Sequence, residues 1–160
     1  MLRSLDRDVE RQIAILRGSS VRLSLMSVAV PRLPYDVVCC AVQAAAPSDA
    51  IGALADHSVG ILSLRSVGPD GGVGVEGRFL PRLQSCLTLA CSRRRVSAHL
   101  LFRAVHRWAS ELLDAEDLID ILFSVPVRRI PLTPGTAHPL IYQPPLRGSG
   151  SGLSAWLRRA

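Results

Sequence analysis

The residues Val21–Val30, VRLSLMSVAV, decide how the rest of this 160-residue chain folds. Their polar and apolar side chains alternate at first, and the segment becomes apolar on both faces toward its end. The alternation and the β-branched content predict a strand. Pro31 and Pro34 follow and end it, because proline cannot donate to a sheet.

Helices are predicted on both sides of this strand. The helix before it has charged residues on one face and ends near Gly18, which suits a C-terminal cap. After the strand, Asp36–Ala46 is predicted to form a short helix with Asp36 as its N-cap. The apolar positions of the first helix recur at spacings of three and four residues: Leu2, Leu5, Val9, Ile13 and Leu16.

Three further elements follow. Val59–Leu64 is predicted to be a second strand, and Arg78–Leu89 a helix with Pro81 confined to its first turn. The pattern of Val96–His106 favours a strand, with a helix over Ser97–Leu113 as the competing interpretation.

The last predicted helix begins at Asp114, which suits an N-cap and is followed by acidic residues that suit the helix dipole. The order of the elements predicts an α+β or α/β architecture with a small sheet. We favour an α+β fold with a small mixed or antiparallel sheet packed with helices. The composition changes after Pro126, so we expect one domain over residues 1–126. A proline- and glycine-rich C-terminal tail would then cover residues 127–160.

The net charge is +6 and the pI about 10.1, and all 19 basic residues are arginine. The arginines are scattered, with one tight cluster at Arg93–Arg95, and they lack the aromatic or glycine-rich interleaving of nucleic-acid surfaces. Nucleic acid is therefore not the expected partner. No apolar stretch has the length of a membrane span and the N-terminus does not resemble a signal peptide, so we expect a cytoplasmic protein without a membrane partner.

The four cysteines do not form a metal-site pattern. Cys39 and Cys40 are adjacent, and the pair Cys86 and Cys91 has no second pair at zinc-site spacing. We expect them to be small buried apolar residues. No metal ligand and no cofactor-binding residue is assigned.

The run Asp56-His57-Ser58 contains the three groups of a hydrolase triad, but consecutive residues on a hairpin point in different directions. A turn is the favoured interpretation, and no catalytic residue is assigned. His99 and His106 are seven residues apart, on opposite faces of a strand, and do not form a joint metal site. His57 and His138 have no visible partner.

Two other features have ordinary structural explanations. Gly72, Gly74 and Gly77 imitate a dinucleotide-binding fingerprint but lack the strand before it and the acidic residue after it. The remaining feature is an acidic face beside the last helix, interpreted as a capped and solvated surface. Its members are Glu111, Asp114, Glu116, Asp117 and Asp120.

The chain resembles the GGDEF domain of bacterial diguanylate cyclases in three stretches. Leu5–Val30 is similar to that family's opening helix, basic turn and first strand. Ser48–Leu64, SDAIGALADHSVGILSL, resembles the turn and hairpin that carry its signature. Val96–Leu122 is similar to the later strand and final helix. The resemblance covers about residues 2–124 and implies a truncated nucleotidyl-cyclase fold of the ferredoxin-like type.

The departures from this family bear on function. In that family, five signature residues at the hairpin contact the guanine nucleotide and help to hold metal. The corresponding positions in this chain are Ala55-Asp56-His57-Ser58-Val59. The metal carboxylate near the end of the first strand falls on Ala29, which cannot ligate Mg²⁺. The product-site tetrad reads Ala46-Pro47-Ser48-Asp49, which keeps the aspartate and lacks the arginine. Only Tyr35–Pro47 stands where the family has a longer nucleotide-binding segment.

The resemblance therefore implies a non-catalytic, GGDEF-like regulatory or scaffolding protein that acts through protein contacts. An unidentified protein partner is expected, and a homodimer through the N-terminal helix is one candidate contact. The alternative is a basic protein that binds nucleic acid or another anionic partner through Arg93–Arg95 and Arg128-Arg129. A small enzyme built on Asp56, His57 and the cysteines is the third hypothesis.

Overall fold

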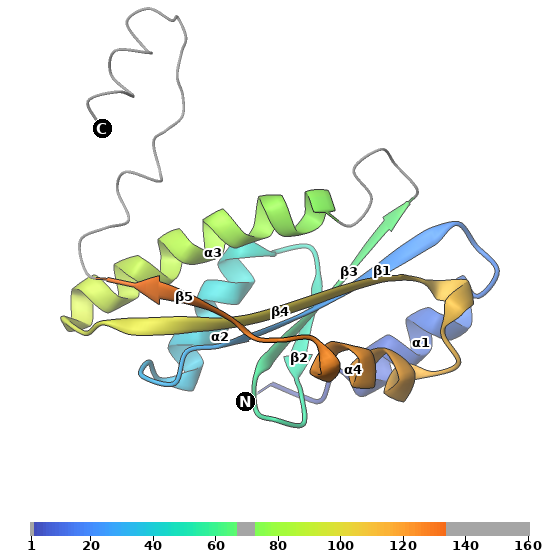
Figure 1. The fold of residues 1–160 in the computed structure, drawn as a ribbon, viewed down its shortest axis with the longest axis horizontal. Coiled ribbons are helices and arrows are strands. Elements are labelled where there is room, and N and C mark those ends of the chain that lie inside the picture. The colour runs from blue at the N-terminus through green and yellow to red at the C-terminus, as the bar shows by residue number, and fades with distance from the viewer. Residues whose placement is uncertain (1, 67–72, 134–160) are drawn as a thin grey trace, which may run out of the picture.

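The computed structural model describes residues 2–66 and 73–133 and has an α+β fold with a five-stranded antiparallel sheet (Figure 1). No helix of these residues is both long and apolar enough to cross a bilayer. In chain order the elements are α1 (Asp6–Leu16), β1 (Val21–Ala29), α2 (Tyr35–Ala45), β2 (Ala50–Ala53), β3 (Val59–Ser66), α3 (Val73–Arg94), β4 (Ala98–Trp108), a short 3-10 helix (Ala109–Glu111), α4 (Ala115–Ser124) and β5 (Arg128–Leu132).

The strand order is β2-β3-β1-β4-β5, so β1 is the middle strand. Leu25 of β1 lies opposite Leu62 of β3 on one side and opposite Val105 of β4 on the other. The strand predicted over Val96–His106 is therefore confirmed, and it pairs with the first strand along its length. A helix over Ser97–Leu113 is excluded, because these residues form β4 and the 3-10 helix for most of that range.

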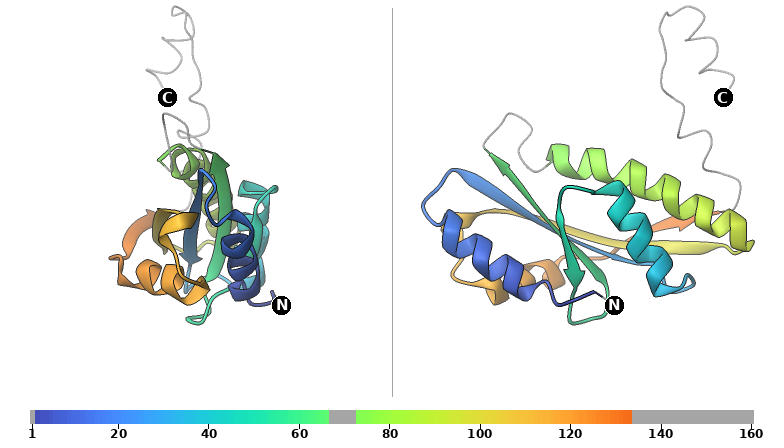
Figure 2. Two further views of the ribbon diagram at one scale, coloured as in Figure 1. Left: turned by 90° about the vertical axis from the view of Figure 1, so that its right-hand side faces the viewer. Right: turned by 180° about the vertical axis from the view of Figure 1, so that it is seen from behind.

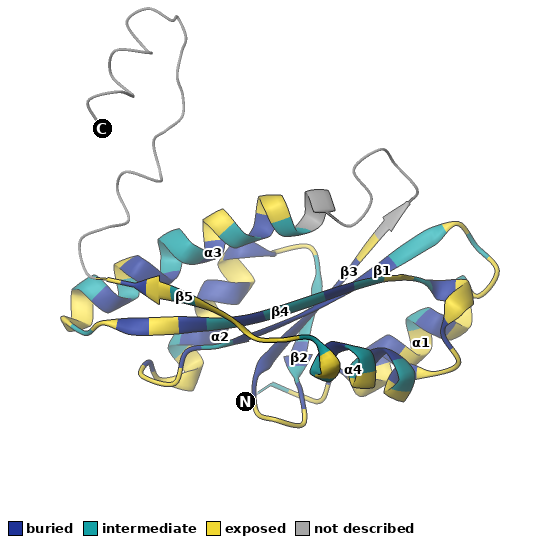
Figure 3. Cartoon of the chain, viewed as in Figure 1, coloured by how far each residue is buried: buried dark blue, intermediate teal, exposed yellow. Residues whose placement is uncertain are grey.

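Each face of the sheet is covered by two helices. Met26 and Val28 of β1 point into a core shared with α2 and α3, and Leu23 and Leu25 point into a second core shared with α1 and α4. Figures 1 and 2 show the two helix pairs toward opposite ends of the long, twisted strands β1 and β4. Since both faces are covered, β1 is buried along most of its length (Figure 3).

Two predicted helix starts are wrong. The N-cap of α2 is Pro34 and not Asp36, whose carboxylate lies in the first turn, where the helix dipole favours it. The third helix begins at Val73, so Pro81 lies inside it and not in its first turn. The burial of Phe79, Leu83 and Leu87 against the sheet outweighs the hydrogen bond that Pro81 removes, a cost of about 3 kcal/mol.

The segment after Pro126 is also different from the prediction. Residues 128–132 are not a tail but form β5, which pairs antiparallel with β4, with Leu132 opposite Ala98. The sequence did not predict this strand because it contains two adjacent arginines and lies among three prolines, and proline is uncommon in strands. Proline is tolerated here because β5 is an edge strand. The rest of the predicted tail, residues 134–160, lies outside the described residues, as does Gly72 of the loop.

Two glycines let the N-terminal segment pack closely against β2 and β3. Gly52 of β2 lies opposite Gly60 of β3. A Cβ atom on Gly52 would lie 2.9 Å from the backbone oxygen of Arg3, and one on Gly60 would lie 2.8 Å from a Leu5 methyl group. Arg3 and Leu5 in turn bond both backbone groups of Ala53, with Ala53 N donating to Arg3 O over 2.8 Å and Leu5 N donating to Ala53 O over 3.0 Å.

Gly52→Ala should destabilise the protein by about 1–3 kcal/mol, because the obstructing atoms belong to the backbone and cannot rotate away. The matched control is Gly77→Ala in α3, where nothing lies within 4 Å of the added methyl group. That variant should gain about 0.5–1 kcal/mol from helix propensity. Urea unfolding followed by circular dichroism measures both. Equal stability of Gly52→Ala and the parent chain would contradict the close contact between β2 and residues 3–5.

Candidate functional site

The polar run between β2 and β3 is a tight hairpin turn. The amide of Leu54 donates to Ser58 O over 3.0 Å, and that of His57 donates to Leu54 O over 2.9 Å. The carboxylate of Asp56 accepts the Ser58 amide over 3.0 Å and the Ser58 hydroxyl. His57 has φ +66°, a value uncommon for a residue with a side chain. Asp56 and Ser58 thus stabilise the turn, and the hydrogen bonds do not join His57 to them.

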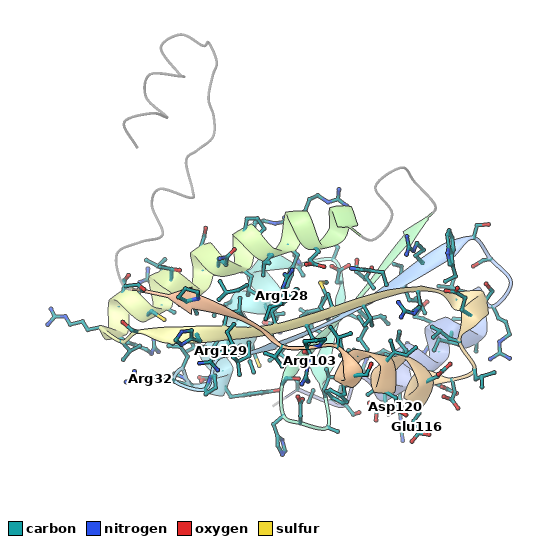
Figure 4. The ribbon with its side chains drawn as sticks, in the orientation of Figure 1. Arg32, Arg103, Glu116, Asp120, Arg128 and Arg129 are labelled. Atoms are coloured by element: carbon teal, nitrogen blue, oxygen red, sulfur yellow. The ribbon has the colours of Figure 1, made fainter. Side chains whose placement is uncertain are left out.

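Arg103 of β4 fixes this turn to the rest of the fold. It lies 3.8 Å from the Asp56 carboxylate, donates to Val125 O over 3.1 Å and stacks over the ring of Phe123 at 5.5 Å. Its side chain is mostly buried, and Figure 4 shows it beside the end of α4. The only carboxylate of the turn is therefore paired with an arginine on the α4 side of the sheet.

A small hollow of about 220 Å³ lies where β1 ends and the hairpin turns. Ala29, His57 and Val59, all singled out by the family resemblance, line it. None of its lining residues is Asp or Glu; the others are Val28, Val30, Pro31, Leu33, Tyr35 and Val38. Burial raises the pKa of Tyr35, so its phenol is neutral at pH 7. This hollow therefore offers no anionic oxygen to a cation.

A second polar group, which the sequence analysis missed, lies under α3. The hydroxyl of Ser24 lies 2.8 Å from His106 Nδ1, and His106 Nε2 lies 3.3 Å from the carboxylate of Glu76. Glu76 also pairs with Arg128 at 2.8 Å. Ser24 and His106 are direct partners across β1 and β4, so the register of these strands was the signal that could have found the pair.

The order Ser24–His106–Glu76 imitates a nucleophile, a base and an acid, but the geometry does not permit attack on a substrate. Ser24 is 0% exposed, so no substrate can reach its hydroxyl. Glu76 is shared with Arg128, whose guanidinium also stacks over Phe102 at 5.0 Å. The network is a set of mutually bonded polar groups, of which Ser24 is fully buried, and it joins β1, β4, β5 and α3.

The cysteines are all reduced thiols, and two of them match the prediction. Cys39 and Cys91 are buried, and this burial raises the pKa of both thiols. Cys40 is exposed and Cys86 half-buried, so for Cys40 the prediction of a buried residue is wrong.

No group of three side chains that could ligate a metal occurs among residues 2–66 and 73–133. Within this part of the chain His99 is exposed and His106 is half-buried. His138 lies outside the described residues.

The two arginine clusters of the sequence analysis, Arg93–Arg95 and Arg128-Arg129, have different surroundings. Arg93–Arg95 are exposed at the C-terminal end of α3, whereas Arg128 is bound to Glu76. Arg32 donates to Ser97 O over 3.0 Å, which places a further guanidinium near this end, and Figure 4 shows Arg32 and Arg129 on the same side of the molecule. None of Arg93–Arg95 forms an ion pair within the described part of the chain.

The acidic face beside α4 divides into two sets. Asp114 caps the helix by accepting the Asp117 amide over 2.9 Å, and Asp117 accepts the Leu113 amide over 3.1 Å. Glu111 accepts the Trp108 amide over 2.9 Å. Glu116 and Asp120 instead line a hollow of about 610 Å³ between α1 and α4. The Gly74 and Gly77 positions lie in α3, so they form no phosphate-binding loop.

Asp56 is thus bonded to Ser58 and paired with Arg103 at the turn, and Ser24, His106, Glu76 and Arg128 form a connected network under α3. Comparison of the chain with protein-family models, with curated proteins and with solved structures gave no match.

The buried hydroxyl groups of the network allow a stability test. Ser63 Oγ is buried without a partner beside Ser24, which lies opposite it across β1 and β3. Ser63→Ala should therefore stabilise the protein by about 1 kcal/mol, because an unsatisfied hydroxyl is removed. Ser24→Ala is the matched comparison, and it should destabilise by about 1–3 kcal/mol because His106 loses its partner. Thermal unfolding of the two variants should shift in opposite directions. A shift of the same sign in both would contradict this assignment.

Proposed function

We propose that this chain is a non-catalytic, GGDEF-like regulatory or scaffolding protein of the cytoplasm that acts through contacts with other proteins. Its order of elements supports the proposal. The unit β1-α2-β2-β3-α3-β4, with neighbours β2-β3-β1-β4, has the split β-α-β-β-α-β arrangement of ferredoxin-like folds. The flanking α1, α4 and β5 add to this unit.

The observation that carries the proposal is the composition of the hollow at the end of β1. Mg²⁺ takes oxygen ligands, and phosphoryl transfer between triphosphates needs metal to neutralise charge. The hollow has Ala29 at the strand end and His57 and Val59 at the hairpin, with no carboxylate in its lining. Asp56, the nearest acid along the chain, is paired with Arg103. A nucleotide triphosphate would therefore meet mostly apolar walls and no carboxylate that could hold its metal ion.

Protein contacts must use surfaces that the fold leaves free. The apolar face of α1 is occupied, because Val9 and Ile13 are buried within the chain. A homodimer through this helix would therefore use its outer face, where Ile15 is 64% exposed. The outer face is therefore the part of α1 that remains accessible to a second copy of the chain.

The protein should bind neither GTP nor cyclic di-GMP, with or without Mg²⁺, because no carboxylate and no arginine lines the hollow. Isothermal titration calorimetry of the full chain measures this, with an active diguanylate cyclase as the positive control. Binding of either nucleotide at micromolar strength would refute the non-catalytic assignment. Synthesis of cyclic di-GMP would refute it as well.

One observation favours a second candidate, an anionic partner such as nucleic acid. Arg93–Arg95 are exposed and unpaired in the described part of the chain, and Arg32 lies near them through its bond to Ser97 O. Such a cluster releases counterions when it neutralises phosphates.

If this candidate is correct, a labelled single-stranded oligonucleotide should bind at low salt and dissociate steeply as salt rises, because binding releases counterions. Arg93→Glu with Arg94→Glu should abolish the binding. The control is Arg7→Glu with Arg107→Glu. It changes the net charge by the same amount, and Arg107 lies at the C-terminal end of β4, away from Arg93 and Arg94. Fluorescence anisotropy measures both. Absence of binding at low salt would eliminate this candidate.

A further inference from the structure

A hollow lies between α1 and α4, on the face of the sheet away from α3. Its volume is about 610 Å³, and its apolar lining comes from the hairpin and from α4: Ala55, Ala115, Ile119 and Phe123. We call it the α1–α4 groove. It lies apart from the hollow at the end of β1, and neither the resemblance nor the proposed function assigns it a role.

The charge of the α1–α4 groove is opposite to that of the whole chain. Four carboxylates line it, from Asp6, Glu10, Glu116 and Asp120, against one guanidinium from Arg7. The net charge of the chain is +6. A groove with an apolar floor and an acidic rim favours an occupant that is apolar on one side and basic on another.

Most of these carboxylates have no partner within the described residues. Glu10 accepts the Ala115 amide over 2.7 Å, and this bond joins α1 to the start of α4. Asp6, Glu116 and Asp120 form neither an ion pair nor a side-chain hydrogen bond through their carboxylates in this part of the chain. Figure 4 shows Glu116 and Asp120 near one another on α4. Three negative charges are thus available to cations.

The sequence itself contains a segment of the required chemistry. The residues Leu153–Ala160, LSAWLRRA, place Leu153, Trp156 and Leu157 at spacings of three and four, and two arginines follow directly. If this segment becomes helical, the three apolar side chains lie on one face. Arg158 and Arg159 would then provide the cations that the acidic rim lacks.

The chain is long enough to bring this segment to the groove. β5 follows α4 after a short connection and the described residues end at Thr133, one residue past β5. A strand of this length carries the chain only about 17 Å away from α4. Residues 134–152 separate this segment from the described part of the chain, and a stretch of that length can reach on the order of 60 Å.

We propose that Leu153–Ala160 docks in the α1–α4 groove of its own chain. Trp156 and Leu157 contact the floor formed by Ile119 and Phe123, and Arg158 and Arg159 pair with Glu116 and Asp120. The apolar contact supplies most of the affinity, and the ion pairs determine the orientation of the segment.

The test uses the full chain with Trp108→Phe, which leaves Trp156 as the only tryptophan. Its emission should be blue-shifted and protected from acrylamide, because a docked indole is removed from water. Asp120→Arg in this background should remove both effects, and so should Arg158→Glu with Arg159→Glu. Combining the two sets of changes restores opposite charges and should recover the protection. Asp36→Arg, an equal change of charge in α2, is the matched control and should leave Trp156 protected.

Three results would overturn the proposal. The first is a solvent-exposed Trp156 in the Trp108→Phe chain. The second is a protected Trp156 that Asp120→Arg does not change, since the segment would then occupy another place. The third is protection that appears only in a dimer seen by light scattering, because the occupant would then come from a second copy. Circular dichroism of each variant confirms that the fold is intact and that a loss of protection comes from release of the segment.

Discussion

The fold depends on the burial of β1 from both sides. Its side chains alternate between two separate apolar cores, and its backbone is bonded to β3 and β4 along most of its length. A strand with these properties is stable only when helices cover both faces of the sheet. This requirement explains why α1 and α4, which lie outside the unit that runs from β1 to β4, pack on the face that α2 and α3 leave open.

The same requirement determines what the polar residues do. Groups that have the chemistry of an active site are used to join elements across the two layers. The Asp56–Arg103 contact attaches the hairpin to α4, and the network from Ser24 through His106 to Glu76 attaches α3 to the sheet. Because these side chains bond one another, they are not free to bind a substrate. The proposed role in protein contacts is consistent with this use of polar groups.

Much of the fold could be predicted from local patterns, because the apolar periodicity of β1, α1 and β4 reflects the core that each contacts. The cap of α4 at Asp114 was also predictable from local sequence, since it depends on a hydrogen bond to a residue only three positions away. The errors came from residues whose local preference was overridden. Pro81 is tolerated inside α3 by packing, and β5 depends on pairing with a distant strand.

The candidate site was harder to predict, since it is made by contacts between residues far apart in sequence. His106 meets Ser24 and Glu76 only through the strand register and the placement of α3. The position of Ala29 beside the hairpin followed from the family resemblance, and the structure places Ala29, His57 and Val59 around one hollow. The pairing of Asp56 with Arg103 could not be read from the sequence, because it crosses the sheet.

The glycine pair of β2 and β3 has a consequence for assembly. By letting residues 3–5 lie against β2, Gly52 and Gly60 allow this segment to pair with Ala53, which covers part of an edge that could otherwise recruit strands from other molecules. The opposite edge is β5, where Pro131 removes a donor and adjacent arginines repel an identical neighbour. Both features disfavour edge-to-edge pairing of the sheet with another molecule.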